Sequence, residues 1–246
     1  MTTRPRLDRA LVAAGLAPSR SRAQALIAEG HVRIDGVPVT RASLAVEPGA
    51  TLEVVGPPDP WVSRGARKLA HALEVFGLDP KDAVALDLGA STGGFTQVLL
   101  RAGAAAVWAV DVGHGQLDPT LRADPRVRLI EGLNARDLTV DHVPAPDWIT
   151  ADLSFISLAK ALPPALGLAR PGAVLVALIK PQFEVGPVFV GKGGIVRDAA
   201  AIARARADVA EFLAAEGWRV IGEAQSPITG GDGNVEYLIG AVKDPA

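Results

Sequence analysis

The sequence predicts an α/β fold with a mostly parallel sheet, preceded by a small α+β domain. After residue 60, short apolar segments alternate with helical segments, which is the pattern of a sheet with helices on both faces. Before residue 56, the pattern is two short helices followed by a hairpin. The segment between them, Gly56-Pro-Pro-Asp-Pro60, contains three prolines and cannot continue a helix or a central strand. We therefore expect one domain over residues 1–58, a linker over 59–64 and a second domain over 65–246.

The elements of the first domain follow from apolar spacing and from stop signals. Apolar residues at helical spacing predict a helix that ends at Gly15, and Ser19 or Ser21 is placed to cap a second helix that ends at Gly30. Alternating valines and isoleucine around Asp35-Gly36 predict a hairpin. The expected elements are helices over 7–14 and 19–30, a hairpin over 32–39 and a strand over 52–54.

The second domain shows repeated strand and helix patterns. One long helix carries Ile202, Val209, Phe212 and Leu213 on a single face. The predicted helices are 66–76, 94–101 and 199–216, and the predicted strands are 84–88, 107–110, 127–130, 148–151, 174–179, 218–222 and 235–242.

Composition excludes several kinds of protein. The chain has no cysteine, which excludes disulfides and thiolate metal sites, and its four histidines are too scattered to predict a metal centre. The N-terminal residues are polar, and the longest apolar runs are too short to cross a membrane. We expect a cytoplasmic protein with no membrane segment and no metal.

Positive charge is concentrated near the N-terminus although the net charge is −2. Residues 1–41 contain seven arginines and three acidic residues, and a second basic group follows at Arg64, Arg67 and Lys68. A single run of charge is more often a solvated surface. Two basic groups on either side of a linker favour a polyanion that binds to both domains, with Arg64 among its contacts.

A glycine-rich turn joins the strand at 84–88 to the helix at 94–101. Gly89 allows a tight turn, while Gly93 and Gly94 allow a ligand to approach the helix N-terminus. Ser91 stands where a dinucleotide-binding turn has its second glycine. Asp87 at the end of the strand would repel a pyrophosphate but attract the cationic amino-acid end of S-adenosyl-L-methionine. The turn therefore predicts that cofactor.

Three polar residues follow the next two strands. Asp111 lies about 20 residues past the glycines, where an acid binds the ribose hydroxyls of a nucleoside. Asn134 and Asp137 follow the third strand, where the adenine edge would lie, and Asn134 is slightly preferred. For Asp111 alone, the alternative is a helix cap.

Four charged residues form the predicted reactive group: Lys68, Asp152, Lys180 and Glu236. Asp152 and Lys180 end two predicted strands, at the edge where open α/β sheets bind ligands. A lysine crowded by a second lysine and removed from water loses its proton more readily and can act as a base toward a hydroxyl. The carboxylates would orient the two ammonium groups. Taken singly, each residue is more often a member of a surface ion pair.

The residues after Asp152 indicate the substrate. Methylases of base amino groups usually carry Asn or Asp followed by Pro-Pro and an aromatic residue, whereas this chain has Asp152-Leu-Ser-Phe155. That difference argues against base methylation. Phe155 is placed to stack on a base flipped toward the pocket, although a buried core phenylalanine is nearly as plausible.

The N-terminal motifs Arg6–Leu11, Ser19–Ala23 and Gly30–Gly36 resemble the S4 domain, a small RNA-binding fold. In that family, arginines on the two helices and the following turn contact the phosphate backbone. The resemblance implies RNA contacts at Arg6, Arg20, Arg22 and Arg33. The alternative is that these arginines only keep a small domain soluble.

Further motifs extend over essentially the whole chain: Trp61–Gly65, Gly89–Thr96, Asp111–Asp118, Asp152–Leu158, Lys180–Glu184, Gly191–Asp198 and Ser226–Gly230. They resemble the TlyA family of rRNA cytidine-2′-O-methyltransferases, whose catalytic domain is similar to the FtsJ group. The resemblance implies a Rossmann-like fold dependent on S-adenosylmethionine, with an antiparallel last strand. It places the group's Lys-Asp-Lys-Glu tetrad on Lys68, Asp152, Lys180 and Glu236, and its interdomain linker on residues 60–63.

The resemblance also implies a partner, ribosomal RNA in ribosomal subunits. The chain has His114 where the family often has tyrosine, and it ends soon after the last predicted strand. Shorter family members tend to modify only the large-subunit rRNA, which favours that substrate here and leaves the small subunit as a second one. Two other functions stay open: a membrane-active hemolysin, since the family also carries that name, and a non-catalytic RNA-binding assembly factor.

Overall fold

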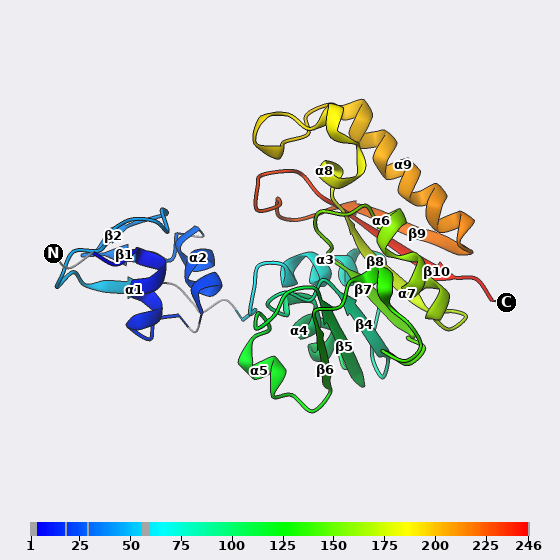
Figure 1. Ribbon diagram of the computed structural model, residues 1–246, viewed down its shortest axis with the longest axis horizontal. Helices are drawn as coiled ribbons and strands as arrows, with labels where there is room; N and C mark the ends of the chain where they lie inside the picture. Colours follow the sequence, from blue (N-terminus) through cyan, green and yellow to red (C-terminus); the bar gives the residue numbers. More distant parts are fainter. Residues whose placement is uncertain (1–3, 18, 29, 56–59, 246) are drawn as a thin grey trace. The chain divides into compact units, whose positions relative to one another are not determined.

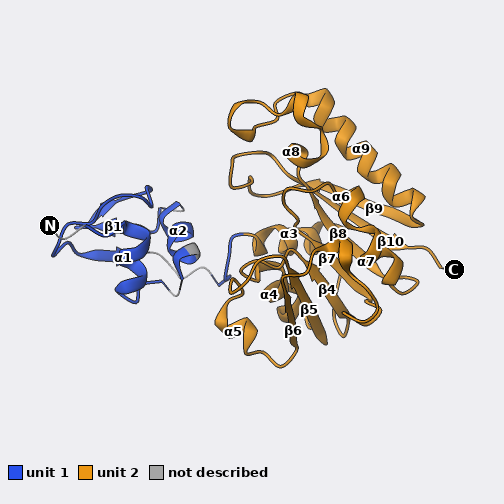
Figure 2. Cartoon of the chain, viewed as in Figure 1, with its two compact units in different colours: residues 1–64 blue, residues 65–246 orange. Residues whose placement is uncertain are grey.

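The computed structural model describes residues 4–17, 19–28, 30–55 and 60–245. The chain divides into two compact units, residues 1–64 and residues 65–246 (Figure 2). Most of the predicted boundary segment, residues 56–59, lies outside the described residues, so the linker over 59–64 remains a prediction. Within the described part of the chain, no helix is long and apolar enough to cross a membrane.

The first unit contains two helices and a small antiparallel sheet, as the sequence predicts (Figure 1). Its buried core includes Leu7, Leu11, Ile27 and Val32. Ser19 caps the second helix, because its hydroxyl accepts a hydrogen bond from the backbone N–H of Arg22 at 3.2 Å. The strand order is β2-β1-β3. The elements are α1 (Leu7–Ala13), α2 (Arg20–Ala28), β1 (Val32–Ile34), β2 (Val37–Pro38) and β3 (Leu52–Val54).

The second unit is a seven-stranded sheet with the order β6-β5-β4-β7-β8-β10-β9. The first five of these strands are parallel, and β10 is antiparallel to both of its neighbours. The predicted fold class is therefore confirmed. The strands are β4 (Val84–Leu88), β5 (Ala106–Asp111), β6 (Val127–Glu131), β7 (Trp148–Ala151), β8 (Val174–Ile179), β9 (Trp218–Gln225) and β10 (Tyr237–Lys243).

The helices of the second unit include several that the sequence pattern does not predict. Three long helices occur where they are expected, whereas the short ones have too few turns to show a helical period. The helices are α3 (Ala66–Phe76), α4 (Gly94–Arg101), α5 (Pro119–Arg122), α6 (Leu158–Ala161), α7 (Pro163–Leu168), α8 (Pro181–Glu184) and α9 (Ala199–Ala215), with 3₁₀ turns at Ala135–Asp137, Pro187–Phe189 and Lys192–Gly194.

Helices cover both faces of this sheet. On β10, Ile239 and Ala241 join the large apolar core that also contains residues of α6, α7 and α9. Gly240 faces the opposite way, because a side chain there would meet the Phe76 ring of α3 at 3.0 Å. Since successive strand residues point to opposite faces, α3 and α9 lie on opposite faces of the sheet.

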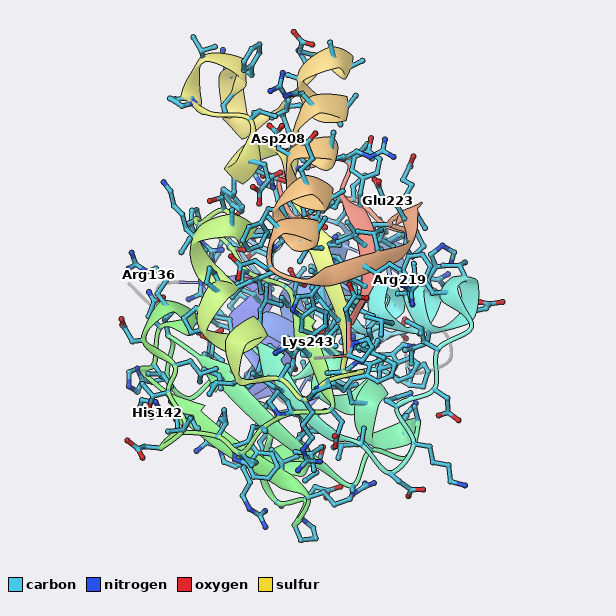
Figure 3. All side chains as sticks on the ribbon, turned by 90° about the vertical axis from the view of Figure 1, so that its right-hand side faces the viewer. Arg136, His142, Asp208, Arg219, Glu223 and Lys243 are labelled. Carbon is cyan, nitrogen blue, oxygen red and sulfur yellow. The ribbon has the colours of Figure 1, made fainter. Side chains whose placement is uncertain are left out.

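Charged residues lie along the β9 edge of the sheet and at the end of β10. β9 is an edge strand that carries Arg219 and Glu223, and the latter forms an ion pair with Arg206 of α9 (Figure 3). Charges on an edge strand discourage pairing with another chain. Lys243 at the end of β10 donates hydrogen bonds to the Leu166 and Ala169 carbonyls, at 2.9 and 2.8 Å, and so stabilises the end of α7.

Candidate active site

The glycine-rich turn after β4 lies directly beside the residue that follows β7. A Cβ atom on Gly89 would lie 2.6 Å from the backbone carbonyl oxygen of Asp152, and φ at Gly89 is +79°. Only glycine permits both this close approach and this backbone conformation. Ser91 also has a positive φ, 47°, which residues other than glycine rarely adopt. Gly89 therefore lets the turn after β4 pass directly against Asp152, the residue that follows β7.

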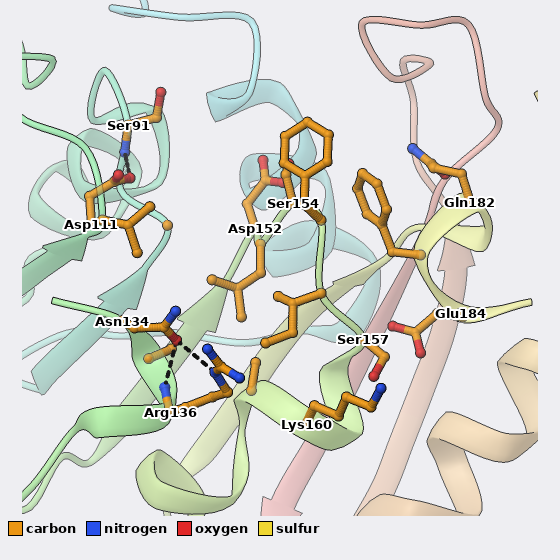
Figure 4. Close-up of a pocket in the computed structure, with 18 of the residues that line it drawn as sticks. Ser91, Asp111, Asn134, Arg136, Asp152, Ser154, Ser157, Lys160, Gln182 and Glu184 are labelled. Carbon is orange, nitrogen blue, oxygen red and sulfur yellow. Dashed lines mark hydrogen bonds between the residues drawn. The ribbon is translucent and has the colours of Figure 1, made fainter. Parts of the chain in front are cut away.

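A pocket of about 1380 Å³ opens along the carboxyl ends of the parallel strands (Figure 4). Its lining comes from the segments that follow β4, β5, β6, β7 and β8, where open α/β sheets bind their ligands. In Figure 4, Asp152 lies between Ser91, Asp111 and Asn134 on one side and Gln182 and Glu184 on the other. The pocket is large enough for two ligands to meet at Asp152.

Four of the predicted cofactor residues line this pocket: Gly89, Ser91, Asp111 and Asn134. The Asp111 carboxylate accepts hydrogen bonds from the backbone N–H groups of Ser91, at 2.8 Å, and Gly113, at 2.7 Å. A carboxylate oxygen that accepts one such bond retains a lone pair for another. Asp111 is therefore oriented by the backbone and still able to accept bonds from ribose hydroxyls.

The other predicted cofactor residues, Asp87, Gly93, Gly94 and Asp137, are not part of the pocket lining. Asp137 is exposed on the 3₁₀ turn after β6, so the pocket favours Asn134. A Cβ atom on Gly93 would lie 2.3 Å from the Leu121 side chain. The space that a side chain at Gly93 would need is therefore filled by packing against α5, and ligand approach at Gly93 and Gly94 stays a prediction.

Asp87, which is expected to attract the cationic amino-acid end of the cofactor, lies behind the pocket surface and not in its lining. Its side chain is fully buried, and its two carboxylate oxygens accept hydrogen bonds from the hydroxyls of Thr96, at 2.6 Å, and Thr150, at 2.8 Å. Burial raises the pKa of Asp87 to about 6 although both hydrogen bonds act to lower it. Asp87 in β4 thus links α4 and β7 through its hydrogen bonds to Thr96 and Thr150. These bonds stabilise the segment behind the glycine turn.

The four predicted reactive residues lie together next to the pocket. The Lys180 ammonium is 2.6 Å from Asp152 Oδ1, and the Lys68 ammonium is 3.6 Å from Asp152 Oδ2. Lys68 also lies 2.6 Å from Glu236 Oε2. All four side chains are largely shielded from solvent, and Asp152 alone among them lines the pocket. We refer to Lys68, Asp152, Lys180 and Glu236 as the tetrad.

The sequence predicts two lysines crowded against each other, but in the tetrad a carboxylate lies between them. Asp152 lies between Lys68 and Lys180, so each ammonium group faces a carboxylate. Burial acts to raise the pKa of Asp152, but attraction to the two ammonium groups and hydrogen bonds from them prevail and lower that pKa. Asp152 is therefore ionised and holds both lysines in place.

Phe155 and Phe183 form an aromatic pair at the mouth of the pocket. Their ring centroids are 5.2 Å apart, and both residues line the pocket. Phe155 is 91% exposed and has a φ of +64°, so it is not a core residue. An exposed apolar ring on strained backbone is unfavourable without a ligand, which makes Phe155 a candidate stacking surface.

In the first unit, the predicted RNA-binding arginines differ in their surroundings. Arg6 and Arg20 each bind the buried carboxylate of Asp8, at 3.2 and 2.8 Å, and both remain about half exposed. Burial acts to raise the pKa of Asp8, but hydrogen bonds from Arg20, Gln24 and Arg6 hold it well below its ordinary value. These two arginines therefore also stabilise the fold. The others are exposed Arg33 and half-buried Arg22 and Arg64.

Several residues at the site were not predicted from the sequence. Ser154 accepts a hydrogen bond from the Lys180 ammonium at 2.9 Å and lines the pocket. Gln116 lies beside Ser91, whose hydroxyl donates to its side-chain oxygen at 3.2 Å. Glu184 lines the pocket from α8. Each belongs to a motif that the sequence analysis quotes, but a motif does not show which of its side chains face the ligand.

Family models match both units. An S4 domain model matches residues 5–52, and the FtsJ-like methyltransferase model matches residues 61–243, which is most of the chain. The chain is 49% identical over 241 residues to a protein named 16S/23S rRNA (cytidine-2′-O)-methyltransferase TlyA from Mycobacterium tuberculosis. That alignment covers 97% of this chain and 90% of the relative. The chain belongs to the TlyA family.

Other members of the TlyA family carry a different name. Hemolysin A of Brachyspira hyodysenteriae is 40% identical over 95% of this chain and 98% of its own length. A solved structure described as a hemolysin from Streptococcus thermophilus is 38% identical, with a TM-score of 0.79 over 100% of this chain and 90% of that one. Family membership, the S4 domain and the FtsJ-like methyltransferase domain agree with the resemblance found in the sequence.

Proposed function

We propose that this TlyA-family protein transfers the methyl group of S-adenosylmethionine to the 2′-hydroxyl of a cytidine in ribosomal RNA, with the large-subunit rRNA as its substrate. The observation that carries the proposal is the buried tetrad beside a pocket that extends to both sides of Asp152. One arm is lined by Ser91, Asp111 and Asn134, and the second arm by Gln182 and Glu184. The name of the Mycobacterium tuberculosis relative supports the reaction and the cytidine target. The S4 domain supports an RNA substrate.

The arm of the pocket near β5 fits the cofactor. Asp111, Asn134 and Ser91 line this arm. We assign the Asp111 carboxylate to the ribose hydroxyls and Asn134 to the adenine edge, and Ser91 adds a hydroxyl. Gly89 brings this arm next to Asp152, so a donor bound in the arm would have its sulfonium end toward the tetrad. When bound, S-adenosylmethionine supplies an electrophilic methyl group carried on positively charged sulfur.

The tetrad prepares the substrate hydroxyl. We assign to Lys180 the role of general base: it accepts the proton of the hydroxyl as the oxygen bonds to the methyl carbon and the carbon–sulfur bond of the donor breaks. Asp152 orients Lys180 through their 2.6 Å contact, and the Lys68–Glu236 pair holds Asp152 from the buried side.

The test is Lys180→Met in the full chain, assayed for transfer of tritiated methyl groups to large ribosomal subunits from a strain that lacks the gene. We expect activity to fall by about 10²–10⁴-fold, while calorimetry shows S-adenosylhomocysteine binding close to wild type. Lys81→Met, at an exposed lysine outside the pocket, is the matched control. Full activity in Lys180→Met would refute the assigned role, and methylation of a base instead of a ribose would refute the proposed reaction.

The names of two relatives make membrane lysis the second candidate function. The same wild-type preparation can be added to vesicles of phosphatidylcholine and phosphatidylglycerol that contain a self-quenched dye. Methyl transfer without dye release would support the methyltransferase. Dye release that persists in Lys180→Met would show that lysis is a separate activity.

A further inference from the structure

The short helix α8 connects the tetrad to the second arm of the pocket. Lys180 is the residue immediately before α8, and Gln182, Phe183 and Glu184 of the helix all line the pocket. Lys180 is the N-cap residue, with extended backbone, and Glu184 is the last residue of α8, so this one helix separates the tetrad from Glu184. A ligand that reaches Asp152, which binds Lys180 and lines the pocket, enters the same pocket that Glu184 lines.

Glu184 uses only part of its hydrogen-bonding capacity within the protein. Its Oε1 accepts a hydrogen bond from the backbone N–H of Leu158 at 2.8 Å, which satisfies one donor at the start of α6. Its Oε2 has no hydrogen bond or ion pair to any residue that the structure describes. The side chain is half-buried, and Figure 4 shows its carboxylate directed toward Ser157 and the pocket interior.

The aromatic pair determines where a base would lie relative to Glu184. Phe155 is the proposed stacking surface, its ring contacts Phe183, and Phe183 is the neighbour of Glu184 on α8. Phe155, Phe183 and Glu184 line the same pocket, so a base that stacks on Phe155 shares that pocket with the side chains of α8. Gln182 and Glu184 are the polar groups that α8 contributes to this lining, and both are candidates to read the edge of the base.

A carboxylate is an acceptor only, so it distinguishes bases by the donors that they present. Cytosine carries an amino group at position 4, which a glutamate accepts well, whereas uracil carries a carbonyl oxygen there. We propose that Glu184 is the specificity residue that selects cytidine over uridine, by accepting a hydrogen bond from the 4-amino group through Oε2. The inference rests on the proposed function, and adds the residue that reads the base.

The substitution Glu184→Gln tests this role while keeping the structural one. Its amide oxygen can still accept the Leu158 N–H bond, and its NH₂ group then faces the pocket in place of the acceptor. The substrates are transcripts of large-subunit rRNA with cytidine, uridine or pyrimidin-2-one riboside at the position that the wild-type protein methylates. The last of these lacks the amino group and adds no bulk.

For the wild-type protein, we expect strong preference for cytidine and at least roughly tenfold lower kcat/KM for the pyrimidin-2-one transcript. In Glu184→Gln, the ratio of kcat/KM for cytidine to that for uridine should fall by at least roughly tenfold. Glu131→Gln is the matched control, because Glu131 also accepts a backbone N–H bond, from Gly115, but lies outside the pocket lining. Its cytidine-to-uridine ratio should equal that of the wild type.

Three results would overturn the inference in different ways. Equal wild-type rates on the cytidine and pyrimidin-2-one transcripts would show that the protein does not recognise the 4-amino group. This result needs no variant of the protein. An unchanged ratio in a folded Glu184→Gln variant would assign Glu184 to the cap of α6 alone and leave the proposed function intact. No ribose methylation of any transcript or of ribosomal subunits by the wild type would overturn the proposed function as well.

Discussion

Lys68 and Glu236 form a buried ion pair, 2.6 Å between Nζ and Oε2, with side-chain exposures of 8% and 3%. Lys68 comes from α3, before the first strand of the sheet, and Glu236 immediately precedes the last strand. The pair therefore joins the two ends of the second unit behind Asp152. The contribution of this ion pair to the free energy of unfolding can be measured separately from its contribution to methyl transfer.

We predict that Lys68→Met lowers the free energy of unfolding by about 3–5 kcal/mol, because it leaves the buried Glu236 carboxylate without its cation. Urea unfolding measures this. The double variant Lys68→Met/Glu236→Gln removes both charges and should recover a large part of the stability but none of the methyl transfer. Equal stability of the single and double variants would contradict the predicted coupling.

The raised pKa of Asp87 predicts a stability that depends on pH. Its pKa in the folded protein is about 6, against an ordinary 3.8. The folded state therefore binds the proton more tightly, and the stabilisation from this proton is present at low pH and lost as pH rises from about 4 to about 6. Relative to Asp87→Asn, the wild type should lose about 3 kcal/mol over that range.

Urea unfolding of both proteins at a series of pH values from 4 to 7 checks the Asp87 prediction. Asp141→Asn, which changes an exposed aspartate, serves as the control and should follow the wild type at every pH. A constant stability difference between wild type and Asp87→Asn would show that Asp87 has an ordinary pKa in the folded protein.

For the S4 domain, Arg33 and Arg20 should behave differently. Arg33→Ala is expected to weaken rRNA binding and to reduce the slope of log affinity against log salt by about one, with no change in stability. Arg20→Ala should weaken binding and also lower the melting temperature, because buried Asp8 loses a hydrogen bond of 2.8 Å. Filter binding over a range of KCl concentrations, together with thermal unfolding, separates the two. Equal thermal stability of both variants would contradict the structural role of Arg20.

Phe155 offers a direct test of base stacking. Phe155→Ala should reduce kcat/KM for rRNA by about 5–150-fold, and should leave the melting temperature nearly unchanged because the ring is 91% exposed. Phe155→Tyr retains a stacking ring and should restore most of the activity. Loss of activity in Phe155→Tyr equal to that in Phe155→Ala would exclude stacking as its function.

Much of the architecture follows from local patterns in the sequence. The strand at Val84–Leu88 and the helices at Ala66–Phe76 and Gly94–Arg101 occur at the predicted residues, because apolar periodicity and glycine stops are local signals. The alternation of strands and helices was enough to predict a parallel sheet, and therefore which residues stand at the ligand-binding edge. The short helix α8 was missed because four residues are too few to show a period.

The detailed chemistry of the site depended on contacts between distant segments. Only the folded chain shows that Asp152 separates the two lysines, that Asp87 is buried under two threonines, and that Glu184 has a free carboxylate oxygen in the pocket among the residues described. Burial, hydrogen-bond partners and electrostatic attraction arise between residues far apart in the chain. Local patterns can therefore indicate which side chains gather at the sheet edge, and only their packing decides what each one does there.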